Sequence, residues 1–209
     1  MSQSATGLRE HRRRETLRSL SECARRLTAD RGFAGFTIEE LCEEAGVSRR
    51  TFFNYFAAKE DAVLGFPALR DDDALDAAFV AGGTPTAGAP SADLVDALLE
   101  LFIARWARMA LTASEAERVF AIIEQEPRLH SRILQLVREG EDRTIALVER
   151  REGLAAGDIR AHTLVHVVGT LNRVVAEEFL RDHGDAPPSI DEFADRLRTR
   201  AAVVRELFG

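Results

Sequence analysis

Hydrophobic residues recur every three or four positions in nearly every segment of the chain. No segment alternates between apolar and polar residues with a period of two between hairpin turns. The pattern therefore predicts an all-α protein of about nine helices. The first helix is expected over residues 8–30, where leucines and alanines form one apolar stripe, and Gly32 supplies its stop.

Short polar signals mark where the next helices begin. Thr37 and Glu40 form a Thr-x-x-Glu capping box that starts a second helix, which Gly46 ends. Ser48 is placed to cap a third helix over residues 49–56, and Lys59 opens a fourth. Later helices are expected over residues 91–109, 114–123, 127–151, 158–182 and 189–208.

A change of composition marks the expected domain boundary. Residues 71–90 are acidic and then rich in Ala, Gly and Pro, with a short helical piece around residues 74–80. This segment predicts a division into two domains, residues 1–66 and residues 67–209. The later caps are expected at Ser91, at Ser114 with Glu117, and at Ser189 with Glu192.

Charge is unevenly distributed along the chain. The formal net charge is −7, but residues 1–60 hold 11 Lys and Arg against 9 Asp and Glu, while the remainder hold 17 against 26. Only the N-terminal part therefore suits a polyanion. Its first helix begins with a cluster of arginines that could approach a phosphate backbone, although such clusters also occur in solvated tails. They are Arg9, Arg12, Arg13, Arg14 and Arg18.

Residues 37–56 have the organisation of a helix-turn-helix. Two short helices flank a three-residue turn, in which Gly46 relaxes the backbone and Val47 fills the core between the helices. In such a unit the second helix lies in the major groove with its N-terminal side chains at the base edges. Arginine pairs with guanine and asparagine with adenine through two hydrogen bonds each. The candidates for base recognition are Arg49, Arg50 and Asn54.

Residues 8–66 resemble the DNA-binding domain of the TetR family of bacterial one-component repressors. The resemblance rests on Phe33, Phe36 and Thr37, on Ala45, Gly46, Val47 and Ser48 at the turn, on Thr51, Tyr55 and Phe56, and on Lys59 and Glu60. It implies that Arg49, Arg50 and Asn54 face bases, and Ser48 is a further candidate for DNA contact. The phosphate ligands that it implies are Thr37, Thr51, Tyr55 and Lys59.

The aromatic residues of this segment are expected to have different environments. Phe53 stands where members of the family commonly have a tyrosine, so that hydroxyl contact to phosphate cannot form, and Phe53 is expected to touch a sugar or a thymine methyl group. Phe52 and Phe56 are expected in the core, whereas the hydroxyl of Tyr55 needs a polar partner. Lys59 is the one lysine of the sequence, which fits a point-charge anchor for phosphate.

The resemblance further implies that residues 67–209 form a regulatory domain that binds a small-molecule effector and dimerises. The helices over residues 158–182 and 189–208 carry more apolar surface than one bundle contact needs, so we expect a homodimer through them. A pocket between helices would be mostly apolar with a few polar groups, although any of these residues could simply be core. Its candidate contacts are Phe102, Trp106, Met109, Phe120, His130, His166, Asn172 and Arg173.

Other kinds of site find little support in the sequence. His162 and His166 share one face of a helix, but no third ligand lies nearby, so no metal and no cofactor are expected. Cys23 and Cys42 lie among apolar residues and are expected to pack rather than react. Arg173 could pair with an anionic effector or with an acidic residue across the dimer.

The expected function is therefore a ligand-responsive repressor that binds a palindromic double-stranded operator and is released by its effector. A helical small-molecule-binding protein acting as an activator or dual regulator is the alternative. A scaffold with a decayed DNA-binding unit is disfavoured by the intact Arg49, Arg50 and Thr51. No phosphate loop, nucleophile elbow or His-Glu-x-x-His motif points to an enzyme. Without a signal peptide or a long apolar run, a cytoplasmic location is expected and no membrane association.

Overall fold

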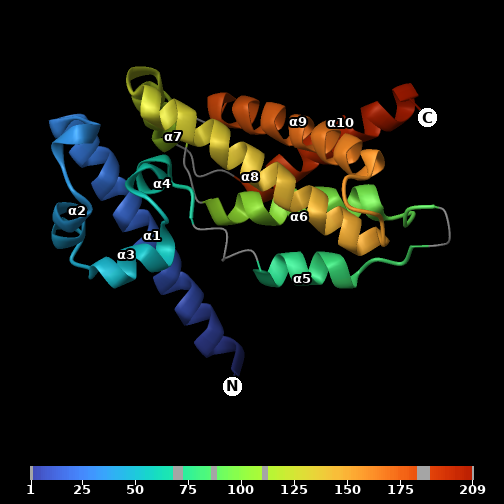
Figure 1. Cartoon of the computed structure of the whole chain (residues 1–209), viewed down its shortest axis with the longest axis horizontal. Coiled ribbons are helices and arrows are strands. Elements are labelled where there is room, and N and C mark those ends of the chain that lie inside the picture. The colour runs from blue at the N-terminus through green and yellow to red at the C-terminus, as the bar shows by residue number, and fades with distance from the viewer. Residues whose placement is uncertain (1, 68–72, 86–88, 110–112, 183–188, 209) are drawn as a thin grey trace. The chain divides into compact units, whose positions relative to one another are not determined.

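The computed structural model describes residues 2–67, 73–85, 89–109, 113–182 and 189–208. Within these residues every element is a helix, as the hydrophobic pattern predicted (Figure 1). The elements are α1 (Ser2–Arg31), the 3-10 turn η1 (Phe33–Gly35), α2 (Ile38–Glu44), α3 (Arg49–Tyr55), α4 (Lys59–Leu64), α5 (Asp73–Ala81), α6 (Leu94–Met109), α7 (Ala113–Gln125), α8 (Pro127–Glu152), α9 (Ile159–Asp182) and α10 (Ile190–Phe208).

Two compact units make up the chain. The first contains α1 to α4 together with residues 115–134, and the second contains α5, α6 and residues 135–209, so that α8 contributes to both. The predicted domain boundary at residue 66 stays a prediction. In the structure, α7 and the first turns of α8 belong to the same compact unit as the N-terminal helices.

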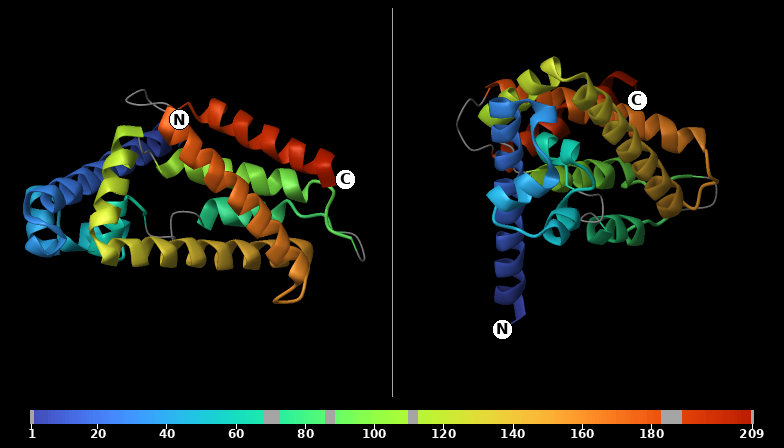
Figure 2. Two further views of the ribbon diagram at one scale, coloured as in Figure 1. Left: turned by 90° about the horizontal axis from the view of Figure 1, so that it is seen from above. Right: turned by 60° about the vertical axis from the view of Figure 1, so that its left-hand side comes forward.

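The first unit is organised around α1, which packs against η1, α2 and α4 (Figures 1 and 2). The predicted stripe of α1 is buried, with Leu20, Ala24 and Leu27 no more than 1% exposed. Phe33 and Phe36 close this core with their rings edge to face, 6.4 Å between centroids. These apolar contacts fix the turn between α1 and α2 and so position the helix-turn-helix.

Residues 115–134 join this first unit through a buried ion pair. The Arg132 guanidinium on α8 donates from Nε to Asp61 Oδ1 at 2.6 Å and from Nη2 to Asp61 Oδ2 at 3.0 Å. Asp61 lies on α4, and its side chain is only 3% exposed. The pair is bidentate, which is the geometry that best offsets the cost of removing two charges from water.

The core of the second unit comes from α5, α6, α8, α9 and α10. The helices α9 and α10 pack along one another (Figure 2). Phe179 on α9 and Phe193 on α10 are both fully buried and meet edge to face at 5.8 Å. In the part of the chain that the structure describes, no helix has both the length and the apolar character that crossing a membrane requires.

Two predicted helix starts differ from the structure. The first helix begins at Ser2 rather than at residue 8. Residues 2–7 carry no apolar stripe and so gave no helical signal in the sequence, but adding turns to an existing helix costs little free energy. The helix expected from Ser91 begins at Leu94. The Ser91 hydroxyl instead accepts a hydrogen bond from the Thr84 backbone N–H at 3.0 Å, and the Ser91 N–H donates to Glu152. The capping box expected at Ser114 lies outside the described side chains.

Candidate DNA-binding interface

Local hydrogen bonds build the turn between α2 and α3. The Thr37 hydroxyl accepts from the Glu40 N–H while the Glu40 carboxylate accepts from the Thr37 N–H, so the predicted capping box is confirmed. Gly46 has a φ of +67°, a left-handed conformation that favours glycine. The Ser48 hydroxyl then accepts from the Thr51 N–H at 3.0 Å, which confirms the predicted cap. These bonds fix α3 to begin at Arg49.

The helix α3 has one buried and one exposed side. Phe52 and Phe56 are fully buried, as predicted, whereas Phe53 is 46% exposed. The other exposed side chains on α3 are the three candidates for base recognition. They are Arg49, Arg50 and Asn54.

Arg49 is held at the surface by neighbouring side chains. Its Nη1 lies 2.8 Å from Glu39 Oε1, and its guanidinium carbon lies 5.8 Å from the centroid of the Phe53 ring. Both Arg49 and Glu39 are more than half exposed, so their ion pair contributes at most about 1 kcal/mol. A base or phosphate can therefore replace Glu39 at small cost.

Two of the hydroxyl groups predicted to hold phosphates, those of Thr37 and Thr51, already have internal partners. Thr37 Oγ1 donates to Glu40 Oε2 at 2.9 Å, and Thr51 Oγ1 lies 2.8 Å from Ser48 Oγ. The Tyr55 ring is half-buried, with the Arg13 guanidinium 5.5 Å from its centroid. The hydroxyls of Thr37 and Thr51 would thus exchange an internal hydrogen bond for one to DNA.

Lys59 has an internal role that the sequence did not reveal. Its Nζ donates to the carbonyl oxygens of Phe33 and Phe36, both at 2.6 Å, and lies over both rings, 4.4 and 4.2 Å from their centroids. Burial lowers the pKa of Lys59. An ammonium has three N–H donors, so one is left for a phosphate. The phosphate contact of Lys59 stays a prediction, next to an observed role in fixing η1.

We expect Lys59→Ala to lower the free energy of unfolding by about 2 kcal/mol, because hydrogen bonds from a charged donor to two carbonyls are lost. Urea denaturation measures this. The exposed Arg128 on α8 gives a matched control, and Arg128→Ala should change stability by less than about 0.5 kcal/mol. If Lys59 served only as a phosphate anchor, its loss would flatten the salt dependence of DNA binding and leave stability unchanged.

The eight candidate effector contacts have different environments in the described structure, and their role stays a prediction. The Trp106 ring stacks on Phe193 at 4.5 Å, and Phe102 packs against the same core. Asn172 is half-buried, and its Oδ1 is enclosed without a hydrogen-bond partner in the described structure. Met109 lies outside the described side chains. The exposed members are Phe120, His130, His166 and Arg173.

Arg173 and the paired histidines have local contacts. Arg173 Nη1 lies 3.6 Å from Glu177 Oε1 one turn along α9, an exposed pair. The His162 and His166 rings are 6.1 Å apart. Among the described residues, no cluster of three or more potential metal ligands is found. Cys23 and Cys42 are both buried thiols, and burial raises the pKa of Cys42.

The comparisons with known proteins agree with this geometry. Residues 21–64, which include α2, α3 and α4, match the model of the bacterial regulatory proteins of the tetR family. The chain is 29% identical over 178 residues to the HTH-type transcriptional regulator TcmR of Streptomyces glaucescens, covering 83% of this chain and 76% of that protein. The resemblance seen in the sequence is thus confirmed. The chain carries the DNA-binding domain of the TetR family and is a DNA-binding transcriptional regulator.

A solved structure is also similar to the chain. A TetR-family transcriptional regulator from Mesorhizobium loti MAFF303099 aligns with 92% of this chain and 98% of its own, at 18% sequence identity and a TM-score of 0.45. At that score the two need not share one arrangement of helices over their whole length. The similarity to the family therefore rests on the sequence matches and on the helix-turn-helix.

Proposed function

We propose that this regulator is a ligand-responsive repressor that binds a palindromic operator as a homodimer and leaves it when a small-molecule effector binds residues 67–209. The observation that carries the DNA-binding part is the exposed N-terminal end of α3, where two arginines follow directly on a capped helix start. An α-helix presented in this way enters the major groove with its first residues at the base edges.

Base recognition is assigned to Arg49, Arg50 and Asn54, because their side chains are exposed on α3 and carry the donors that purines accept. Phe53, exposed beside them, offers an apolar contact to a sugar or a thymine methyl group. The surrounding residues are assigned to phosphates, which position the helix without specifying the sequence. They are Thr37, Ser48, Thr51, Tyr55 and Lys59.

We expect Arg49→Ala to weaken operator binding by about 1–3 kcal/mol and to relax the preference at one base position, since a bidentate contact to guanine is lost. Glu39→Gln is expected to act in the opposite direction, because it frees Arg49 and removes a negative charge beside DNA. Fluorescence anisotropy with operator variants measures both effects. Unchanged affinity and preference in Arg49→Ala would remove Arg49 from the recognition set.

The proposed homodimer is supported by apolar side chains at the surface of α9 and α10. Val167 is 42% exposed, Val203 47% and Leu207 71%. Large apolar side chains exposed on neighbouring helices favour association with another surface. A two-fold dimer also matches an operator built of two inverted half-sites. Sedimentation at micromolar concentration should show a dimer, and a monomer alone would rule it out.

The whole proposal is tested by selecting bound sequences from random double-stranded DNA with the full chain. A repressor of this kind should select two inverted half-sites, with centres about 10 base pairs or a multiple of that apart. Gel-shift assays with small metabolites then look for release from the selected site. Selection of single half-sites, or of no consensus, would contradict the proposed dimeric operator.

A further inference from the structure

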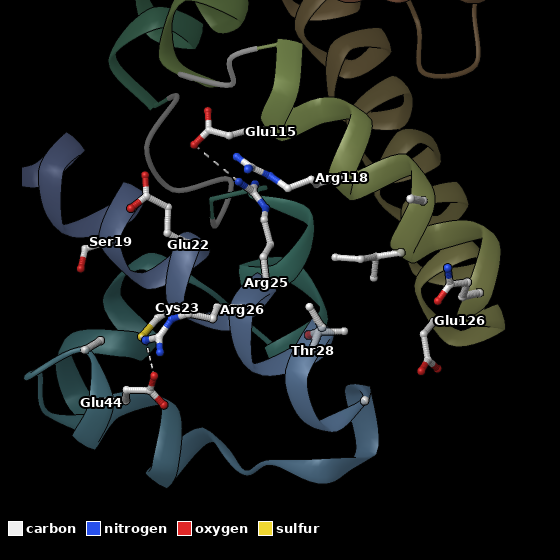
Figure 3. A pocket seen from close by; sticks show the side chains of 16 residues that line it. Ser19, Glu22, Cys23, Arg25, Arg26, Thr28, Glu44, Glu115, Arg118 and Glu126 are labelled. Carbon is white, nitrogen blue, oxygen red and sulfur yellow. Dashed lines mark hydrogen bonds and ion pairs between the residues drawn. The ribbon is translucent and has the colours of Figure 1, made fainter. Parts of the chain in front are cut away.

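A cavity of about 920 Å³ lies within the first unit, between α1, the end of α2 and α7 (Figure 3). It is separate from the exposed side of α3, and none of the candidate effector contacts lines it. Most of the residues that line it are polar or charged, and they lie at both ends, with Glu115 and Arg118 at one and Glu44 and Glu126 at the other (Figure 3). The apolar part of the lining is Cys23, Ala29, Ala45, Ala121 and Ile122. A volume of this order is typical of small-molecule sites.

Arg25 on α1 is a buried charged group in the wall of this cavity. Its side chain is only 8% exposed, its Nε donates to the Val63 carbonyl at 2.9 Å, and its Nη1 lies 3.9 Å from Glu115 Oε1. Its Nη2 is enclosed and has no hydrogen-bond partner among the described residues. Leaving a charged donor without an acceptor in a buried position is costly, so an acceptor placed there would be bound favourably.

The charges around Arg25 are unbalanced. Figure 3 places the guanidinium groups of Arg25 and Arg118 together beside the Glu115 carboxylate. Arg18 Nε completes this group, 2.9 Å from Glu22 Oε1 and 3.7 Å from Glu115 Oε1. Burial lowers the pKa of Arg25, Glu115 opposes this lowering, and repulsion from Arg118 adds to it. Among the side chains that the structure describes here, three arginines thus face two glutamates, an excess of one positive charge.

The other charged groups of the cavity are paired or distant. Arg26 is bound to Glu44, and Glu126, which directly follows α7, lies away from Arg118 (Figure 3). Arg118 is exposed and makes no hydrogen bond or ion pair with any described residue, so its N–H donors are available to an anion. The excess charge is therefore confined to the end of the cavity where Arg25 and Arg118 meet.

We propose that this cavity binds an organic monocarboxylate. Its carboxylate accepts hydrogen bonds from Arg25 and Arg118, and its apolar body lies against Ala29, Ala121 and Ile122. A carboxylate matches the planar fork of a guanidinium, and one negative charge balances the excess positive charge. A dianion such as phosphate is disfavoured, because Glu22 and Glu115 already supply two negative charges there. The site lies outside the DNA-contacting surface and does not depend on the proposed repressor function.

Isothermal titration calorimetry of the full chain with octanoate tests the site. Octanoate is expected to bind saturably, one molecule per chain, while acetate and 1-octanol bind more weakly, because each lacks either the apolar body or the charge. Arg118→Gln should weaken octanoate about tenfold or more, the loss expected for a hydrogen bond to a charged group. Arg128→Gln is the matched control, an exposed arginine outside the cavity, and should bind octanoate like the wild type.

Arg25→Gln should abolish octanoate binding, and since Arg25 also holds the Val63 carbonyl, its fold is checked by circular dichroism. If that variant does not fold, Arg118→Gln decides the question, because the exposed Arg118 makes no described contact that the fold needs. Ala121→Trp fills the apolar wall and should block octanoate without changing the charges. Three results would overturn the proposal. They are a failure of octanoate to bind saturably, binding of 1-octanol as tight as that of octanoate, and octanoate binding that is unchanged in both Arg118→Gln and Ala121→Trp.

Discussion

Replacing Arg132 by methionine is expected to lower the free energy of unfolding by about 3–5 kcal/mol, the cost of leaving a buried charge without its partner. Asp61 is 3% exposed and receives two hydrogen bonds from Arg132, at 2.6 and 3.0 Å. Methionine fills most of the volume of the arginine stem, so the loss comes mainly from the unpaired carboxylate. Because the pair joins α8 to α4, the destabilisation should appear in the unit that carries the helix-turn-helix.

Two further variants separate this effect from a general loss of packing. Arg128→Met removes an exposed arginine one turn earlier on α8 and should change stability by less than about 0.5 kcal/mol. The double variant Asp61→Leu, Arg132→Met removes both charges of the pair and should regain most of the loss. Urea denaturation followed by circular dichroism measures all three. A loss below about 1 kcal/mol in Arg132→Met would mean that the pair is in effect solvated.

The helix-turn-helix could be predicted from the sequence because its determinants are local. The cap of α2 depends on Thr37 and Glu40, three residues apart, and that of α3 on Ser48 and the Thr51 N–H. The left-handed turn requires glycine at Gly46. Each of these signals lies within a few residues of the bond that it predicts, so no knowledge of the tertiary structure was needed.

The buried charges could not be predicted in the same way, because their partners lie far along the chain. Asp61 and Arg132 are 71 residues apart, and a single charged residue in a helix usually faces solvent. One signal was present on α1, where Ser21, Arg25 and Thr28 are buried at helical spacing next to the leucine stripe. A polar stripe beside an apolar one indicates a helix that packs on two sides, and α7 provides the second contact for Arg25.

The candidate effector contacts show where hydrophobic patterning stops being informative. The pattern identifies apolar faces, but it does not separate a side chain that fills the core from one that lines a pocket. The sequence predicted Trp106 and Phe120 equally as effector contacts. In the structure, Trp106 stacks on Phe193, whereas Phe120 is 47% exposed. Which residues surround an effector therefore remains a prediction to be tested by binding.

Phe52→Ala is expected to lower the free energy of unfolding by about 3–5 kcal/mol, the range for removing a fully buried phenylalanine. The Phe52 ring is 0% exposed and lies 5.3 Å from the Phe53 ring centroid and 5.8 Å from that of Phe56. Alanine would leave a cavity under α3 that this seven-residue helix is too short to close by itself. Operator binding should weaken as well, because α3 is held in place by that ring.

The adjacent Phe53→Ala supplies the matched control, since it removes the same side chain from the exposed side of α3. The free energy of unfolding of Phe53→Ala should fall by less than about 1 kcal/mol. Any change in its operator affinity would then come from a lost contact between Phe53 and DNA. Measuring urea denaturation and DNA affinity for both variants thus determines how α3 is oriented. Equal destabilisation by the two substitutions would contradict that orientation, and with it the assignment of Arg49, Arg50 and Asn54 to bases, because all three share the exposed side with Phe53.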